Sequence, residues 1–487
     1  MRYLARRYGE FNGIKIPDVL NIEKLPVERQ RLETRKLTTV ESGSIVVLNR
    51  VNKLNAREFV RTITEVRTRY PDKIIYLPYF GLPSDYPIIF YLGVDLLDDS
   101  PIRMLGNKRC TSEFGLYDGE GCLERNEGEK KRILDLIHLS LEHGKFRELV
   151  ESHSFSNFSK EALRIVDMEF YPFIEKYMDY RPKRIVAANV EGLYRPEIVD
   201  FRKRVIEMKQ TAENLLLIPC SAVKPYSRSK THRILHSFIK YHLPGIQEVI
   251  VTSPLGLVPR ELESLFPAMY YDIPVTGHWF DEEKRILYDL SKEFFKGKKY
   301  SNVFYILPEQ EGRLIEIFNE SNGISGNLNY ENSEKLARIL DSYSIKGNRR
   351  RKEAVEYSNV LKFLYGVEVK PDDISLKNEG NRQIIEVAGS PVLKKTRGGV
   401  QMMKGLAELL ASKGVRTIEV SGVFIGNNVF IPGIKAISED VKPGMEVALV
   451  HEGMVVGRGV SHLSFFDLSI ERKGIGLDQV TYFSKEL

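Results

Sequence analysis

Hydrophobic and polar positions alternate most regularly between residues 181 and 345. Short apolar runs rich in branched residues occur at 184–190, 214–219, 248–252 and 302–307, and amphipathic helical patterns separate several of them. Short strands that alternate with helices predict βαβ units and a mainly parallel sheet. We therefore expect a three-layer, parallel-sheet α/β catalytic domain over residues 181–345.

Residues 1–180 mix short strands with helices. The runs at 44–49 and 73–80 predict strands, and the apolar spacing within 57–70 predicts a helix. Residues 86–100 are expected to form a buried strand with a polar end, followed by a helical block from about 129 to 177.

The last third of the chain changes character. A basic run, KGNRRRKEAVEY, begins at 346 and opens a small α+β domain that we expect over 346–413. Residues 414–487 contain short strands with Gly and Pro turns every several residues, a pattern that predicts a small β-barrel. The whole chain is thus predicted to be an α/β multidomain protein.

Composition narrows the class of protein. A length of 487 residues suggests roughly three or four domains, and the net charge of +6 favours an anionic partner. Three cysteines suggest no disulfide framework, which fits a reducing cytoplasm. No apolar run approaches the roughly 20 residues that span a bilayer, so we expect a cytoplasmic protein with no membrane partner.

The densest group of reactive side chains is PCSAVKPYSRSKTH, residues 219–232. Cys220 and Ser221 directly follow a predicted strand, and ligands of parallel sheets bind beyond such strand ends. Ser227 or Ser229 is expected to cap the next helix. Together with the cations Lys224, Arg228 and Lys230, that helix N-terminus predicts a thiol with a lowered pKa. A small buried hydrophobe is the alternative role for this Cys.

The C-terminal segment resembles the PUA domain. The resemblance rests on Pro432-Gly433-Ile434, on Pro443-Gly444 before a strand, on Gly457-Arg458-Gly459 and on the pair Gly474 and Gly476. PUA domains bind structured RNA, so the resemblance implies RNA contact. We expect contributions from Gly433 and Arg458 and from the basic run Arg349, Arg350, Arg351 and Lys352. Alternatively, most of these glycines only close the corners of the barrel.

The N-terminal segments 76–100 and 134–167 resemble tRNA-guanine transglycosylases. That family has a TIM barrel, an Asp nucleophile and a structural zinc. Too few residues precede Tyr76 for most of such a barrel, and no counterpart of the nucleophile is found. Cys110 and Cys122 do not match the zinc pattern, so we expect no metal and a shortened transglycosylase-like domain over residues 1–180.

Three motifs together resemble archaeosine synthase: residues 219–232, TSPLGLVPRELE at 252–263 and YDIPVTGHW at 271–279. The resemblance implies an archaeal enzyme that adds a nitrogen nucleophile to the nitrile of 7-cyano-7-deazaguanine at position 15 of tRNA, which gives an amidine. It implies tRNA and free lysine as substrates and a radical-SAM partner protein that cleaves the adduct. It implies no cofactor of the chain's own, and a homodimer is left open.

Two mechanisms are compatible with these residues. In one, Cys220 attacks the nitrile and an amine displaces the sulfur from the resulting thioimidate. In the other, the sulfur only packs while Lys224, Tyr226 and His232 polarise the nitrile. The expected substrate-binding residues are Ser221, Ser227, Ser229, Ser253, Gly256, Arg260, Glu261, His278 and Trp279.

Several of these residues also have structural alternatives. Arg260 and Glu261 could hold the amino acid or form an ion pair at a helix start. Trp279 could stack on the base or pack in the core. Two other functions stay open: base exchange by a transglycosylase, and a non-catalytic subunit that presents tRNA to a partner enzyme.

Overall fold

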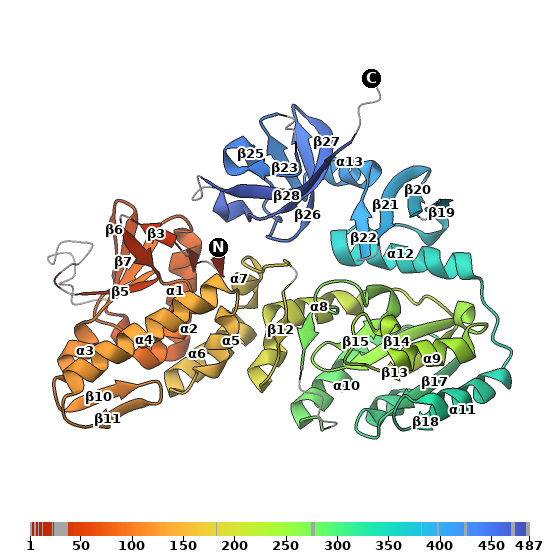
Figure 1. The fold of residues 1–487 in the computed structure, drawn as a ribbon, viewed down its shortest axis with the longest axis horizontal. Helices are drawn as coiled ribbons and strands as arrows, with labels where there is room; N and C mark the ends of the chain where they lie inside the picture. The colour runs from red at the N-terminus through yellow and green to blue at the C-terminus, as the bar shows by residue number, and fades with distance from the viewer. Residues whose placement is uncertain are drawn as a thin grey trace. The chain divides into compact units, whose positions relative to one another are not determined.

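The computed structural model describes residues 2–3, 6–7, 9–11, 13–21, 23, 38–181, 183–273, 278–380, 382–396, 399–422, 426–468 and 473–483. The chain forms two compact units (Figure 1). Unit 1 comprises Met1–Asp179 with Phe466–Glu471, and unit 2 comprises Tyr180–Phe465 with Arg472–Leu487. Each unit has its own buried hydrophobic core. None of the helices in these ranges combines the length and hydrophobicity that crossing a bilayer requires.

Unit 1 contains an open five-stranded sheet of order β5-β9-β8-β7-β6. Its strands are β5 (Asp18–Leu20), β6 (Thr38–Ser42), β7 (Ile45–Asn49), β8 (Ile74–Leu77) and β9 (Leu96–Asp98). The predicted helix is α1 (Ala56–Arg69), which starts at a capping box formed by Asn55 and Glu58. The helical block comprises α4 (Cys122–Glu142), α5 (Phe146–Ser152), α6 (Asn157–Glu169) and α7 (Tyr171–Glu175).

The expected strand over 86–100 is wrong in its first half. Residues Tyr86–Tyr91 form the helix α2, with Pro87 in its first turn, and only Leu96–Asp98 form a strand. Every residue of α2 is buried, so it is apolar on all sides. An apolar run of this length has no periodicity that distinguishes a buried helix from a buried strand.

Cys110 and Cys122 correct the expectation of a chain without disulfides. Cys110 lies in the hairpin β10 (Arg109–Ser112) and β11 (Gly115–Asp118), which folds back toward the start of α4. The Cα atoms of the two cysteines are 4.6 Å apart, and their sulfurs form a disulfide. The hairpin brings the two cysteines together although they are 12 residues apart, so their spacing in the sequence does not predict the disulfide.

Unit 2 contains the predicted parallel sheet, of order β15-β14-β13-β17-β18. Its strands are β13 (Asn214–Pro219), β14 (Ile246–Thr252), β15 (Gly256–Pro259), β17 (Asn302–Leu307) and β18 (Asn322–Ser325). All neighbours pair in parallel except β14 and β15. The predicted run at 184–190 gives only β12 (Ile185–Val186), which pairs with β16 (Tyr271–Asp272) in a separate ladder.

Helices cover this sheet in two packed pairs. In one pair α9 (Lys230–Ile239) contacts α11 (Tyr330–Asp341), and in the other α8 (Pro196–Ile206) contacts α10 (Asp281–Phe295). The chain leaves β13 toward β14 on one side and later adds β17 on the other side. This reversal of strand order is a topological switch point, where α/β sheets form ligand crevices.

The rest of unit 2 confirms the predicted α+β segment and the small β-rich segment after it. The helix α12 (Arg349–Tyr365) precedes a four-stranded antiparallel sheet and α13 (Lys404–Ser412). Six strands follow in the order β24-β28-β27-β26-β23-β25. They are β23 (Thr417–Val420), β24 (Val429–Phe430), β25 (Ile434–Ile437), β26 (Glu446–His451), β27 (Met454–Ser461) and β28 (Ile475–Tyr482).

Candidate active site

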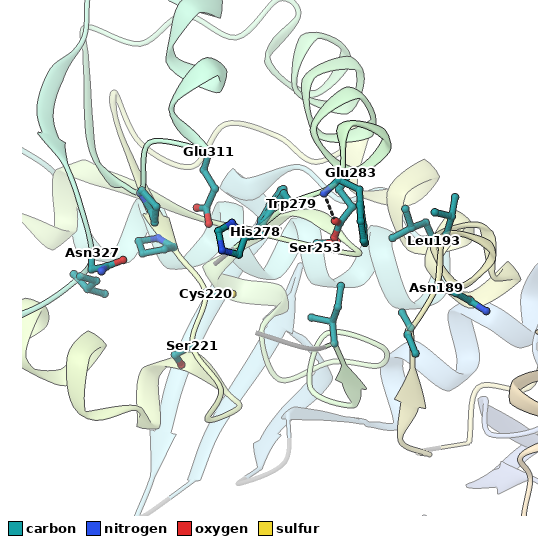
Figure 2. Close-up of a pocket in the computed structure, with 18 of the residues that line it drawn as sticks. Asn189, Leu193, Cys220, Ser221, Ser253, His278, Trp279, Glu283, Glu311 and Asn327 are labelled. Carbon is teal, nitrogen blue, oxygen red and sulfur yellow. Dashed lines mark hydrogen bonds between the residues drawn. The ribbon is translucent and has the colours of Figure 1, made fainter. Parts of the chain in front are cut away.

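A cavity of ≈ 760 Å³ lies at the carboxyl edge of the parallel sheet (Figure 2). Four strands that are neighbours in the sheet each contribute, at or beyond their carboxyl ends, a side chain to it. Cys220 follows β13, Ser253 follows β14, Glu311 lies four residues beyond β17, and Asn327 lies two residues beyond β18. Parallel strands place their carboxyl ends on one edge, so residues more than 100 positions apart in sequence meet in one pocket.

Most of the pocket wall is apolar. Leu193, Ile273, Trp279 and Leu328 contribute hydrophobic surface, and Thr231 reaches the pocket from the first turn of α9. The size and the mixture of apolar walls with a few polar groups are typical of small-molecule sites.

The thiol of Cys220 does not have the lowered pKa that the sequence predicts. Cys220 is half-buried, and burial raises the pKa of its thiol above the ordinary value of 9.0. The hydrogen bond to Thr252 and the charge of Lys224 act in the opposite direction, but they are smaller effects. Arg228 and Lys230 are exposed, so solvent screens the two other cations on which the prediction relied.

A layer of polar side chains lies next to the thiol. The hydroxyl of Tyr226 hydrogen-bonds that of Tyr271 at 2.7 Å, and Tyr271 in turn hydrogen-bonds Thr252. The Nζ of Lys224 lies 4.0 Å from the centre of the Tyr271 ring. Burial lowers the pKa of Lys224. Thr252 thus connects the Tyr226–Tyr271 pair to the sulfur.

The buried side chain of His232 supports the strand end that precedes Cys220. Its Nδ1 accepts a hydrogen bond from Arg260 at 3.1 Å, so Nε2 carries the proton and donates to the carbonyl of Pro219 at 3.1 Å. Burial, followed by the charge of Arg260, lowers the pKa of His232 to about 3. This corrects the expectation that His232 acts on the nitrile, because both ring nitrogens are already engaged.

Arg260 and Glu261 do not form an amino-acid site in this pocket. Arg260 is paired with Glu248 at 2.8 Å and with Glu263 at 2.9 Å. Glu261 accepts a hydrogen bond from the side-chain amide of Asn359 at 2.8 Å. Arg260 therefore has the structural role that the sequence left as an alternative: it forms ion pairs, and both of its partners are buried.

Of the predicted residues, five line the pocket: Cys220, Ser221, Ser253, His278 and Trp279. The remaining predicted catalytic and substrate-binding residues lie outside the lining: Lys224, Tyr226, Ser227, Ser229, His232, Gly256, Arg260 and Glu261. Positions 274–277 of the YDIPVTGHW motif lie outside the described residues.

Three of these outlying residues have evident structural roles. Ser229 caps α9 by accepting a hydrogen bond from the backbone N–H of His232. The backbone N–H of Ser227 donates to Glu263 at 3.0 Å. Gly256 has φ +81°, and a Cβ there would lie 2.4 Å from a methyl group of Leu290, so a larger residue would be strained and would displace Leu290.

Sequence reasoning missed four polar residues of the pocket: Asn189, Glu283, Glu311 and Asn327. The position of Glu311 beyond a predicted strand was the available signal for that residue. Glu283 accepts hydrogen bonds from the hydroxyl of Ser253 and from the backbone N–H of Phe280 (Figure 2). A pair of this kind, joining the ends of distant elements, cannot be found from spacing.

Glu311 is the most perturbed acid of the pocket. Its side chain is only 6% exposed, and within the described ranges its Oε2 has no hydrogen-bond partner. Burial raises the pKa of Glu311 to about 8. The carboxyl is therefore mostly protonated at neutral pH.

The predicted RNA-binding residues differ in accessibility. Arg349, Arg350 and Arg351 are exposed in the first turn of α12, whereas Lys352 is half-buried and donates to the carbonyl of Leu243. Gly433 is half-buried in a short 3-10 turn. Arg458 corrects the prediction: it is buried and paired with Glu446 at 2.7 Å, so its charge serves the barrel core.

Comparisons with known proteins bear on the same region. A family model described as a domain of unknown function (DUF5591) matches residues 198–340, which include β13, β14, β17 and β18. A protein named archaeosine synthase subunit alpha from Thermoplasma acidophilum is 28% identical over 479 residues, 96% of this chain and 92% of that one. The protein of the same name from Thermococcus kodakarensis is 28% identical over 521 residues, 98% and 86% of the two chains.

A more distant relative is the tRNA-guanine(15) transglycosylase of Methanocaldococcus jannaschii. It is 21% identical over 466 residues, 84% of this chain and 65% of that one. The resemblance to archaeosine synthases that the three motifs predicted is confirmed, and so is the weaker resemblance to transglycosylases.

The reactivity of Cys220 tests its environment. Cys220 is the one free thiol of the chain, so alkylation by iodoacetamide can be followed by intact mass. We expect the rate to rise with pH with a midpoint above 9, because burial disfavours the thiolate. Lys224→Met should shift the midpoint higher, since the ammonium lowers the pKa of the thiol. A midpoint near 7 would contradict this description.

The protonation of Glu311 predicts how stability depends on pH. Below pH 4.5 the carboxyl is protonated in both states, but between 4.5 and about 8 only the unfolded state loses the proton. The folded state then binds more protons, so its free energy of unfolding falls as pH rises, by on the order of a few kcal/mol. Glu311→Gln should lack this loss and gain stability relative to wild type between pH 5 and 8.

Urea unfolding followed by the fluorescence of Trp279 measures this difference, because Trp279 lines the same pocket. Glu309→Gln, at an exposed neighbouring acid, is the control and should track wild type at each pH. A constant difference between Glu311→Gln and wild type across the range would show that Glu311 is ionised in the folded protein.

Proposed function

We propose that the chain is a tRNA-modifying enzyme of archaeosine synthesis. In this proposal it adds an amine, free lysine, to the nitrile of 7-cyano-7-deazaguanine at position 15 of tRNA, and the product is an amidine. The single observation that carries the proposal is a thiol and a buried carboxylic acid in one apolar pocket, within a chain that resembles archaeosine synthases over most of its length.

The pocket suits an addition to a nitrile. Adding a nucleophile to the nitrile carbon moves an electron pair onto the nitrile nitrogen, so the site must supply a nucleophile and a proton. A water-poor apolar wall keeps the base oriented and limits hydrolysis of an activated intermediate. Trp279 offers a flat surface on which the deazapurine can stack, a contact worth ~1–3 kcal/mol per base.

Cys220 is the proposed nucleophile of a two-step route. Its sulfur adds to the nitrile carbon to form a thioimidate, and the amine then displaces the sulfur and leaves the amidine. Because burial favours the neutral thiol, this route needs proton removal during attack. In the alternative route the amine attacks the nitrile directly and Cys220 only packs.

In this proposal, three residues outside the pocket lining position the thiol of Cys220. Lys224 interacts electrostatically with Cys220 and favours its thiolate form. His232 holds the Pro219 carbonyl and so sets the place of the thiol. We assign Lys224, Tyr226 and His232 to positioning the thiol, with the reacting atoms left to the pocket residues.

RNA binding is proposed for the exposed start of α12 and the C-terminal barrel. A radical-SAM partner that cleaves the lysine adduct and a homodimeric assembly also remain proposals. Base exchange has less support, because the buried aspartates in and just before β9 already have partners. Asp95 pairs with Arg67, and Asp98 accepts hydrogen bonds from the hydroxyl of Tyr76 and the backbone N–H of Ser100.

Labelled lysine tests the reaction directly. Wild-type protein is incubated with labelled lysine and tRNA that carries the cyano base, and label in tRNA is counted. We expect Cys220→Ser to lower the single-turnover rate by several orders of magnitude with tRNA affinity nearly unchanged, each tenfold loss being ~1.4 kcal/mol of barrier. If Cys220→Ser keeps most of the rate, the thioimidate route is wrong and direct attack is the better mechanism.

Controls separate the mechanism from the function. No label from lysine, glutamine or ammonia with wild-type protein would contradict the proposed reaction as a whole. Exchange of labelled guanine into unmodified tRNA would instead support a transglycosylase. Tight tRNA binding without turnover, and unchanged function of a partner complex when Cys220, Lys224 and His232 are substituted together, would support the non-catalytic subunit.

The basic start of α12 gives a prediction about salt. Replacing Arg350 and Arg351 by Ala should weaken tRNA binding and reduce the slope of log affinity against log salt by about 2, if each contacts a phosphate. The matched control replaces Lys335 and Arg338, exposed cations of α11 that pair with Glu331 and Glu334. Equal slopes for the two double variants would place the RNA elsewhere.

A further inference from the structure

We propose that Glu311 is a further catalytic residue that donates the proton taken up by the nitrile nitrogen and accepts the proton released by the nucleophile. This inference rests on the proposed function. It extends the chemistry to a residue outside the PCSAVKPYSRSKTH motif, contributed by a different strand end.

Glu311 has the position that such a role requires. It lines the same pocket as Cys220, and Figure 2 shows its carboxyl directed toward the side where Cys220 and His278 lie. Its charge, when present, raises the pKa of the Cys220 thiol, so the two groups interact electrostatically. A nitrile carbon bonded to the sulfur of Cys220 would place the nitrile nitrogen in the pocket that Glu311 also lines.

The hydrogen bonding of Glu311 separates it from the other buried acid of the pocket. Glu283 accepts from Ser253 and from the backbone of Phe280, so its carboxyl is used in joining α10 to the end of β14. Among the described residues none hydrogen-bonds the Oε2 of Glu311, although its side chain is more than nine-tenths buried. Buried polar atoms are nearly always paired, so an unpaired one facing a pocket points to a ligand.

Burial, rather than a neighbouring charge, keeps Glu311 protonated. Cys220, His278 and Glu283 face it from the pocket. On its other side it lines a second hollow together with the titratable residues Asp281, Lys284, Arg285, Tyr288, Arg313 and Glu316. Within the described ranges no cation forms an ion pair with Glu311, and burial raises its pKa to about 8. It can therefore donate a proton at neutral pH, as a carboxylate could not.

The proton balance closes on Glu311. When the sulfur of Cys220 bonds to the nitrile carbon, one carbon–nitrogen π bond breaks, the nitrile nitrogen takes the proton of Glu311, and the thiol proton passes to the resulting carboxylate. The amine then bonds to the same carbon, the carbon–sulfur bond breaks, and a proton of the amine passes to the thiolate, which restores the thiol. In direct attack by the amine, the same exchange on Glu311 converts amine and nitrile into a neutral amidine.

Kinetics with the full-length protein test this role. With labelled lysine and cyano-base tRNA, we expect Glu311→Gln to lower the single-turnover rate by roughly 10²–10⁴-fold, the usual contribution of general acid–base catalysis. Wild type should lose rate above a midpoint near pH 8, as Glu311 loses its proton, and Glu311→Gln should lack this limb. Glu311→Asp keeps an acid, so it should recover part of the rate and retain an alkaline limb.

The controls keep the outcomes apart. Glu309→Gln, outside the pocket lining, should retain the wild-type rate, and tRNA affinity should be unchanged in all three variants. If Glu311→Gln keeps more than a third of the wild-type rate with the alkaline limb intact, Glu311 is not the proton donor. If wild type itself transfers no label from any amine, the proposed function fails, and that result differs from selective loss in Glu311→Gln.

Discussion

The candidate site depends on the ion pairs and hydrogen bonds of the largely buried Arg260 guanidinium. A buried charge must be paired, and here the partners are Glu248 on β14, Glu263 beyond β15 and the ring of His232 on α9. Through His232 the same network holds the carbonyl that precedes the thiol, and through Glu263 it holds the backbone N–H of Ser227. One cation thus fixes the end of a strand, the following loop and the start of a helix.

The pocket that this network supports favours neutral groups. Burial raises the pKa values of Cys220 and Glu311 and lowers that of Lys224, so each change is toward the uncharged form. A nitrile and an unprotonated amine are neutral reactants as well. Chemistry that moves protons between neutral groups is therefore better matched to this environment than chemistry that begins from a thiolate stabilised by nearby cations.

The barrel is built into the same unit as the pocket. Ala448 of β26 belongs to the hydrophobic core shared with the parallel sheet, and Glu446 accepts hydrogen bonds from both Tyr365 on α12 and Arg458 on β27. Gly457 allows the close approach of β27 and β28, since a Cβ there would lie 2.6 Å from the carbonyl of Thr481. The glycine and arginine of this motif therefore serve the barrel fold, and for the glycine this is the structural alternative that the sequence left open.

The sequence by itself determined the parallel sheet, the position of the thiol at a strand end, a serine cap on the helix after it and the C-terminal barrel, because these follow from local periodicity and turn residues. The structure decided that the cap is Ser229 and not Ser227. It could not distinguish helix from strand at 86–91, where every side is buried. Nor could it find the Cys110–Cys122 disulfide, the pairing of Arg260 or the Glu311 carboxyl, whose Oε2 has no hydrogen-bond partner among the described residues. Those features depend on which side chains meet and lose water when distant strand ends converge, and only the tertiary structure decides that.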